Sequence, residues 1–269
     1  MFKKRSVHGI SSLKTALFFI SLVVVILVVA ISIKVIETIQ KSIFDGQHQF
    51  VILLESPNNK ATLVDIDPSD TIFSALYINN PKHETIQSDI PLGIDAIVQT
   101  SQAINSIQDV QTALLVSASF MNLRKNSDIT WYDLLRLWYV TKTVNKSKII
   151  EDHITLPANE TDLASAEKLF IDAGLEKESA PIQIINATDI SGEATRLETL
   201  LTNIGCSVID VRTSTTTQSS SMILYYGTIT YTVQKLQRVL GYPIQQTHQQ
   251  MIGAVQIVIG EDGNRLAKF

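Results

Sequence analysis

Few residues that could do chemistry stand at the spacing that chemistry needs in this 269-residue chain. Asp65 and Asp67 lie two positions apart in a predicted strand, so their carboxylates should share one face and could hold a cation. Residues 68–70 (PSD) follow directly and favour a turn as the simpler role. Five scattered histidines and the single cysteine, Cys206, offer no cluster of metal ligands. We therefore expect no metal and no cofactor.

Nucleophilic catalysis has equally little support in the sequence. The histidines considered for a catalytic triad, His48, His83 and His153, stand in polar stretches, and no Gly-x-Ser-x-Gly motif is present. A glycine loop that could cradle phosphate is also missing. The sequence therefore predicts that the protein is not an enzyme.

Binding chemistry is the remaining possibility, and it gathers in the last third of the chain. Polar residues cluster at a predicted strand-to-helix turn, and tyrosines flank the start of a later helix. The turn could accept sugar hydroxyls or a partner's backbone, although helix capping by Ser191 or Asp189 is the plainer explanation. Because adjacent strand residues point to opposite faces, one of Tyr225 and Tyr226 should be exposed for stacking on a ligand. The candidate ligand- or partner-binding residues are Asn186, Thr188, Asp189, Ser191, Gly192, Tyr225, Tyr226 and Tyr231.

A long apolar segment determines where these residues lie in the cell. Residues 15–33 carry no charge, and as a helix they would span roughly 29 Å, close to the thickness of the bilayer hydrocarbon. Four basic residues precede the segment, which predicts a cytoplasmic N-terminus and an extracytoplasmic remainder. A cleavable signal peptide is the alternative, but its apolar region would be about 7–15 residues long. We expect an uncleaved, single-pass anchor in the cell membrane.

The charge of the exported part limits its partners. The segment before residue 35 holds five basic residues and no acid, so the remainder carries 26 acidic and 17 basic residues, a net charge of −9. A nucleic-acid partner is excluded because it requires a basic surface. With one cysteine the exported part forms no internal disulfide and depends on packing.

The middle of the chain alternates between strand and helix patterns. Runs at 50–54, 61–66 and 72–78, separated by turn residues, predict an antiparallel meander. From residue 94 the spacing predicts a helix, and 112–117 a strand. Thr130 and Asp133 stand at capping-box spacing before a helix. We expect its apolar face to be core, namely Trp131, Leu134, Leu135, Trp138 and Tyr139. A strand at 149–156 and a helix at 162–173 are expected to interrupt a connector.

The last ninety residues have the clearest pattern. Strands at 181–187, 207–212, 222–226 and 254–259 alternate with helices at 192–204 and 230–240. This β-α-β-β-α-β order predicts a split-βαβ domain, with one four-stranded sheet and both helices on one face. The fold class is therefore α/β (α+β): one transmembrane helix, a mixed α/β middle domain and this C-terminal domain.

Residues 180–262 also resemble a known family, the LytR C-terminal domain of bacterial envelope proteins. The resemblance lies in Asn186-Ala187-Thr188 where the family has an Asn-Gly-Thr type turn, in residues 192–194 (GEA) opening the helix, in Gly205, and in residues 258–262 (VIGED). It implies a bacterial cell envelope protein whose candidate partners are peptidoglycan, a wall glycopolymer or envelope proteins.

Residues 48–155 are similar, more weakly, to a degenerate LytR-CpsA-Psr phosphotransferase domain. Asp70-Thr71-Ile72 could match its Ser-Asp-Thr motif, but residues 54–56 (LES) stand where that family has Gly-x-Asp. Residues 79–82 (NNPK) stand in place of its Pro-Arg-Asp. Diphosphate chemistry needs cations, and residues 48–135 contain only Lys60, Lys82, Arg124 and Lys125. The resemblance implies a catalytically dead domain.

The expected organisation is a cytoplasmic tail (1–14), a transmembrane helix (15–36), a stalk (37–47), the middle domain (48–155), a linker (156–179), the C-terminal domain (180–262) and a tail (263–269). Three functions stay open. One is a membrane-anchored envelope protein whose C-terminal domain binds wall glycan or an envelope partner. The second is a divergent transferase that attaches lipid-linked glycopolymer to the wall. The third is a structural role, in which the external region only assembles with itself or with a membrane complex.

Overall fold

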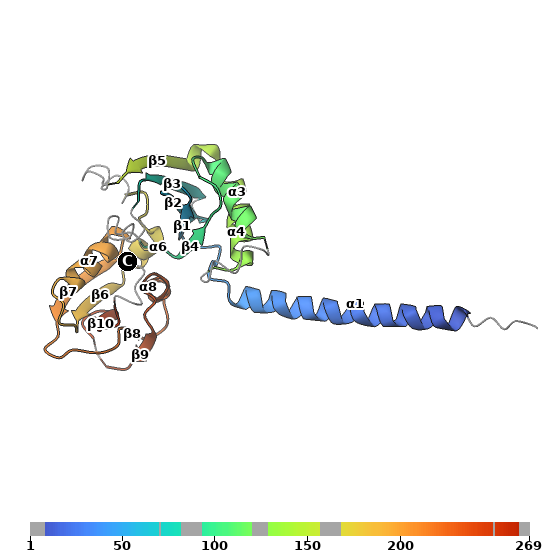
Figure 1. The fold of residues 1–269 in the computed structure, drawn as a ribbon. Coiled ribbons are helices and arrows are strands. Elements are labelled where there is room, and N and C mark those ends of the chain that lie inside the picture. The colour runs from blue at the N-terminus through green and yellow to red at the C-terminus, as the bar shows by residue number, and fades with distance from the viewer. Residues whose placement is uncertain are drawn as a thin grey trace, which may run out of the picture. The chain divides into compact units, whose positions relative to one another are not determined.

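A computed structural model describes residues 9–69, 71–81, 93–119, 129–156, 168–249 and 251–263 of the chain, with side chains from residue 15 onward (Figure 1). The chain divides into two compact units, Met1–Ile43 and Phe44–Phe269. The mixed α/β class predicted from the sequence is confirmed.

The first unit contains one helix, α1 (Gly9–Gln40). Its stretch Thr15–Gln40 is long and apolar enough to cross a membrane, and none of its most apolar window is buried. The helix runs past residue 36, where we expected the span to end. The hydroxyls of Ser21 and Ser32 donate to the carbonyl oxygens of Phe18 and Val28, each at 2.8 Å. These bonds satisfy the hydroxyls within the helix, as a lipid environment requires.

The second unit begins with the predicted meander. Strands β1 (Phe50–Ser56), β2 (Lys60–Asp67) and β3 (Ile72–Asn79) pair antiparallel in chain order, so this prediction is confirmed. Asn58 and Asn59 between β1 and β2 both have positive φ, a conformation that asparagine tolerates in hairpin turns. Residues of β1 are buried on both faces, which explains the unbroken apolar run FVILL.

Two parallel strands complete this sheet in the order β4-β1-β2-β3-β5. β4 (Ala96–Gln99) pairs with β1, and β5 (Ile149–Thr155) pairs with β3 after a short 3-10 turn, η1 (Lys146–Lys148). The predicted helix from residue 94 is therefore wrong, because Ala96 and Val98 alternate onto the buried face of a strand. The predicted strand at 112–117 is also wrong and belongs to helix α3 (Ile107–Ser117).

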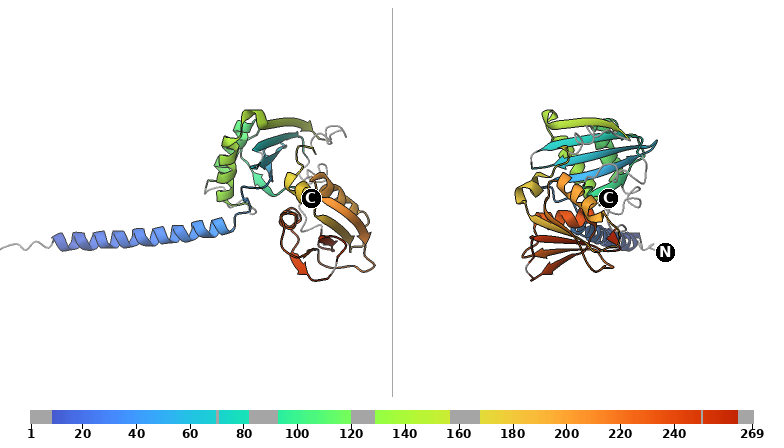
Figure 2. Two further views of the ribbon diagram at one scale, coloured as in Figure 1. Left: turned by 180° about the vertical axis from the view of Figure 1, so that it is seen from behind. Right: turned by 90° about the vertical axis from the view of Figure 1, so that its left-hand side faces the viewer.

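Helix α4 (Trp131–Thr143) lies beside α3 on one side of this sheet (Figures 1 and 2). Its predicted capping box is confirmed: the Thr130 side chain accepts from the Asp133 amide, and the Asp133 side chain accepts from the Thr130 amide. Leu134 is fully buried as expected. Tyr139 is 64% exposed, so assigning it to the core was wrong. Leu137, one turn after Leu134, faces the core instead.

The connector that follows is described only in part. Residues 157–167, where half of the predicted helix 162–173 falls, lie outside the described residues. Helix α6 (Ala173–Glu178) comes next, with Asp172 as its N-cap and Ser179 in the left-handed region at its end.

The C-terminal part forms a second five-stranded sheet, ordered β7-β6-β10-β8-β9. β6 (Pro181–Asn186) and β7 (Ser207–Thr213) are parallel neighbours joined by α7 (Glu193–Asn203). β8 (Met222–Tyr226) and β9 (Ile244–Thr247) are parallel neighbours joined by α8 (Tyr231–Leu240). β10 (Val255–Ile259) runs parallel to β6 and antiparallel to β8, between the two β-α-β units.

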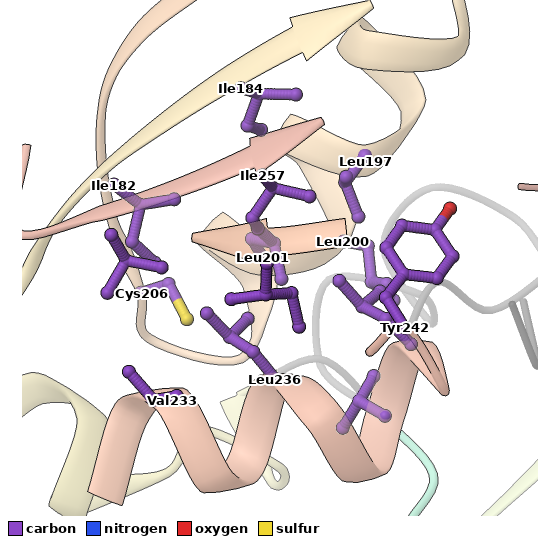
Figure 3. Packing of buried hydrophobic residues seen from close by; sticks show 14 of the residues in the cluster. Ile182, Ile184, Leu197, Leu200, Leu201, Cys206, Val233, Leu236, Tyr242 and Ile257 are labelled. Atoms are coloured by element: carbon purple, nitrogen blue, oxygen red, sulfur yellow. The ribbon is translucent and has the colours of Figure 1, made fainter. Parts of the chain in front are cut away.

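This strand order corrects the predicted split-βαβ domain with four strands. Each helix returns the chain to the strand next to the one it left, so neither β-α-β unit is split. The prediction missed β9, because its sequence IQQT follows a glycine and a proline and resembles a loop. β9 pairs with β8 and adds the fifth strand to the sheet. Both helices nevertheless cover one face of the sheet, as predicted. Figure 3 shows their core: Ile182, Ile184, Leu197, Leu200, Leu201, Cys206, Val233, Leu236, Tyr242 and Ile257.

Candidate functional site

The predicted turn after β6 is held together by Asn186. Its side chain is buried, and its Oδ1 accepts from the backbone N–H of Thr188 at 3.0 Å and from the Thr188 hydroxyl at 2.7 Å. Its Nδ2 donates to the carbonyl oxygen of Ile190 at 2.8 Å. Both ends of the amide are therefore engaged within the turn, which gives Asn186 a structural role.

The other polar residues of this turn lie at the surface. Gly192, with φ of +92°, is the N-cap of α7, and no side chain caps the helix there. The suggested capping by Ser191 or Asp189 is therefore wrong. A small cavity of about 130 Å³ adjoins Asp189 and Glu193. It is smaller than the usual small-molecule site, which starts at roughly 300 Å³.

The three tyrosines lie in different environments. Tyr225 faces the helices and is buried, whereas Tyr226 is 61% exposed, as the alternation of strand residues predicts. The Tyr231 hydroxyl donates to Asp172 Oδ2 at 2.6 Å, and its ring stacks on His48 with centroids 4.0 Å apart. Of the three, Tyr226 has the exposure that a ligand contact requires.

A row of hydrogen-bonded side chains crosses the open face of the C-terminal sheet, opposite the helices. Gln256 Nε2 on β10 donates to Gln183 Oε1 on β6 at 2.6 Å, and Gln183 Nε2 donates to Asp210 Oδ2 on β7 at 2.6 Å. Arg212 Nε lies 2.7 Å from the same Asp210 oxygen. The bond from Gln183 and the adjacent Arg212 lower the pKa of Asp210, so it remains a carboxylate.

This row forms one wall of a groove of about 340 Å³, which falls within the usual range for small-molecule sites. Its lining mixes apolar and polar side chains, which come from all five strands and from the segment that joins β9 to β10. The lining residues are Gln183, Ile185, Arg212, Leu224, Thr247, Gln249, Met251, Ile252 and Gln256.

None of these lining residues was among the predicted site residues, although the sequence carried a partial signal. Gln183 and Gln256 interrupt otherwise apolar strands at positions that alternate with the core residues Ile182, Ile184 and Ile257. Period-2 alternation thus places both glutamines opposite the helices. What the sequence does not contain is the pairing of β6 with β10, which brings the two amides together.

The comparison with known families bears on this same part of the chain. Residues 179–262 match the LytR_C family. That family is described as "LytR cell envelope-related transcriptional attenuator". The resemblance proposed from the sequence is thereby confirmed for residues 179–262, which form a domain of this cell envelope-related family. No curated protein and no solved structure matches the chain.

A buried polar network lies where the LytR_C domain meets the first sheet. Lys235 on α8 is 1% exposed, and its Nζ lies 2.6 Å from Asp95 Oδ2 and 3.5 Å from Asp172 Oδ2. The same ammonium donates to the backbone carbonyl of Gln49 at 3.4 Å. Asp95 also accepts from the backbone N–H of Val51, at 2.9 Å. One buried cation thus ties α8 to the start of β1 and to the residue before β4.

Asp65 and Asp67, weighed earlier as a cation site, have separate roles. Asp67 Oδ1 accepts from the backbone and hydroxyl of Ser69, which confirms the turn role. Asp65 Oδ2 accepts from Gln49 Nε2 at 2.6 Å, and burial raises the pKa of Asp65 well above its ordinary value. No group of three metal-ligating side chains suited to an ion is found among the described residues.

The candidate transferase positions are only partly visible. Lys60 donates to Asn105 Oδ1 at 3.0 Å, while Asp70, Lys82, Arg124 and Lys125 lie outside the described residues. Residues 54–56 end β1 with Glu55 and Ser56, and Ser56 Oγ lies 3.2 Å from Thr100 Oγ1. These contacts are structural, and the degenerate transferase domain remains a prediction.

Proposed function

We propose that this chain is a single-pass envelope protein whose extracytoplasmic LytR_C domain binds cell-wall glycan. The observation that carries the proposal is a groove of small-molecule size on the open face of the domain that matches a cell envelope-related family. The apolar helix Thr15–Gln40 supports a membrane anchor. Lys3, Lys4 and Arg5 before it support a cytoplasmic N-terminus.

A non-catalytic role fits the chemistry of the described residues. The buried cation Lys235 is engaged by two carboxylates and a backbone carbonyl, so it is not available to a diphosphate. The matched family is described as an attenuator. We therefore propose that the domain holds its ligand and positions the anchored protein at the wall without turning the ligand over.

The test is co-sedimentation of the full-length protein, in mild detergent, with isolated cell-wall sacculi. The full chain is needed because a fragment starting near residue 175 would lack Asp95 and Asp172 and leave Lys235 without its carboxylates. Pelleting with the sacculi at both low and moderate salt is the expected result, since the groove contacts do not depend on net charge. Failure to pellet at either salt would contradict glycan binding. Crosslinking in native membranes would then identify a protein partner.

A further inference from the structure

We infer that the groove on the open face of the LytR_C sheet takes one N-acetylated sugar unit of a glycan, recognised by its acetamido group. The inference rests on the proposed function and adds the ligand's chemistry and the residues that read it. Those residues are the polar Gln256 and Arg212 and the apolar Leu224, Met251 and Ile252 of the groove lining.

The hydrogen bonds among Gln256, Gln183 and Asp210 determine which polar atoms are available to a ligand. Gln183 uses its Oε1 on Gln256 and its Nε2 on Asp210, so it positions its neighbours. Gln256 gives one N–H to Gln183, which leaves its Oε1 as an acceptor and its second N–H as a donor. Arg212 meets Asp210 through Nε, which leaves its Nη groups as donors. An amide in the ligand offers the matching donor and acceptor.

The charge of the groove favours a neutral ligand. Arg212 is the only cation among the lining residues, and Asp210 neutralises it at 2.7 Å. A phosphate or polyanionic glycopolymer would therefore gain little electrostatic attraction at this site. Glutamine amides and the Thr247 hydroxyl instead suit uncharged hydroxyl and acetamido groups.

The apolar residues of the lining complete the match to a sugar. Ile185 and Leu224 lie in the groove, with Met251 and Ile252 beside them, and Ile252 is 55% exposed. Such residues can bury the acetamido methyl and the C–H face of a sugar ring, while the polar groups of the sugar meet the glutamine amides. Tyr226 follows Leu224 on the same face of β8 and is 61% exposed, which places an aromatic ring beside the groove.

A peptide fits this location less well. Extended peptides usually bind by adding a strand to a free sheet edge. The groove instead lies on the face of the sheet, where β6, β10 and β8 have paired neighbours on both sides and the edge strands β7 and β9 contribute only Arg212 and Thr247. Its volume of about 340 Å³ is at the lower end of small-molecule sites and suits one sugar unit with its substituent.

The test uses full-length protein in detergent and two soluble probes, followed by ligand-observed NMR titration. The first probe is the β-1,4-linked tetramer of N-acetylglucosamine, and the second is the matching tetramer of glucose, which lacks the acetamido group. We expect the acetylated tetramer to bind at least about tenfold more tightly, the size of effect that one lost, well-placed polar contact produces. Equal affinity for both probes, or no binding of either, would overturn the inference.

Variants then locate the site. Gln256→Leu and Ile252→Asp should each weaken binding of the acetylated tetramer about tenfold. Gln237→Leu is the matched control, because Gln237 is exposed on α8, on the other face of the sheet, and should leave binding unchanged. Ile252 is exposed, so its variant should fold even if Gln256→Leu does not. Sacculus binding that survives in both groove variants would overturn the inference and leave the proposed function standing. If the unaltered protein does not bind sacculi, that result would instead contradict the proposed function.

Discussion

At the scale of single residues, Asn186 shows how a polar cluster can be structural. Asn186→Ala removes the bonds to Thr188 and to the carbonyl of Ile190, so we expect the free energy of unfolding to fall by about 1–2 kcal/mol. Urea denaturation of residues 44–269, the second compact unit, would measure it. Ser191→Ala is the control and should change stability by less than about 0.5 kcal/mol. A larger loss of stability in Ser191→Ala would mean that the Ser191 side chain caps α7 after all.

Asp65 should give the fold a measurable dependence on pH. Its carboxyl is 3% exposed, burial raises its pKa above the ordinary 3.8, and the hydrogen bond from Gln49 and the charge of Lys235 only partly offset this. The folded chain therefore keeps a proton that the unfolded chain releases. The resulting stability is complete below the unfolded pKa and is lost as the pH rises through the folded pKa.

The variant Asp65→Asn isolates this effect because asparagine keeps an oxygen acceptor for Gln49 and does not titrate. Relative to Asp65→Asn, the wild-type chain should lose stability steadily as the pH is raised from about 3.8. Urea midpoints of both proteins between pH 3.5 and 8, on the same fragment, would show it. A difference between the two that stays constant with pH would mean that Asp65 has the same pKa folded and unfolded.

At the scale of elements, Lys235 of α8 is the buried cation at the contact between the two sheets. Lys235→Met removes the ammonium from the buried Asp95 and Asp172 and leaves Asp95 only the more distant Arg238, at 3.8 Å, so we expect a cost of about 3–5 kcal/mol. Lys177→Met on the exposed side of α6 is the matched control and should be nearly neutral. Combining Lys235→Met with Asp95→Asn should recover part of the loss in urea denaturation. A Lys235→Met protein as stable as the control would show that the network contributes little.

Elements with a local signal were predictable, and elements defined by distant partners were not. The meander was visible from turn residues between apolar runs, and α4 from Thr130 and Asp133. β4 was missed because its four residues become a strand only by pairing with β1, about forty positions earlier. The start of α3 did carry a signal, since Ser106 accepts from the amide of Asp109, but serine with aspartate is a weak form of the capping box.

At the scale of the whole molecule, the sequence located the domain and missed the groove. The match at 179–262 agrees with the pattern of strands, helices and glycines that suggested the family. The predicted site residues lie on one sequence-local turn and on β8 and α8, because residues close in sequence are the ones that a pattern can group. The groove instead needs β7, β6, β10 and β8 side by side, and that strand order follows from long-range pairing.

The orientation of the whole chain across the membrane is the last prediction. In a Cys206→Ala background, Tyr139→Cys should react with a membrane-impermeant maleimide on intact cells, since Tyr139 is 64% exposed on α4. Ser6→Cys, on the basic side of the helix, should react only after lysis. The Cys206→Ala substitution should change background labelling little, because the Cys206 thiol is buried and burial raises its pKa to about 12.

The same cysteine pair distinguishes the three possible arrangements of the first unit. A cleaved leader would remove Ser6→Cys from the mature chain, so that label would be absent after lysis while Tyr139→Cys still reacts. An inverted chain would exchange the two results. Replacing Lys3, Lys4, Arg5 and Lys14 with glutamine should increase the inverted fraction, because the proposed cytoplasmic N-terminus depends on those charges and only Lys34 and Lys41 closely follow the span. An unchanged orientation in that variant would mean that the large second unit, and not the basic flank, determines how the chain inserts.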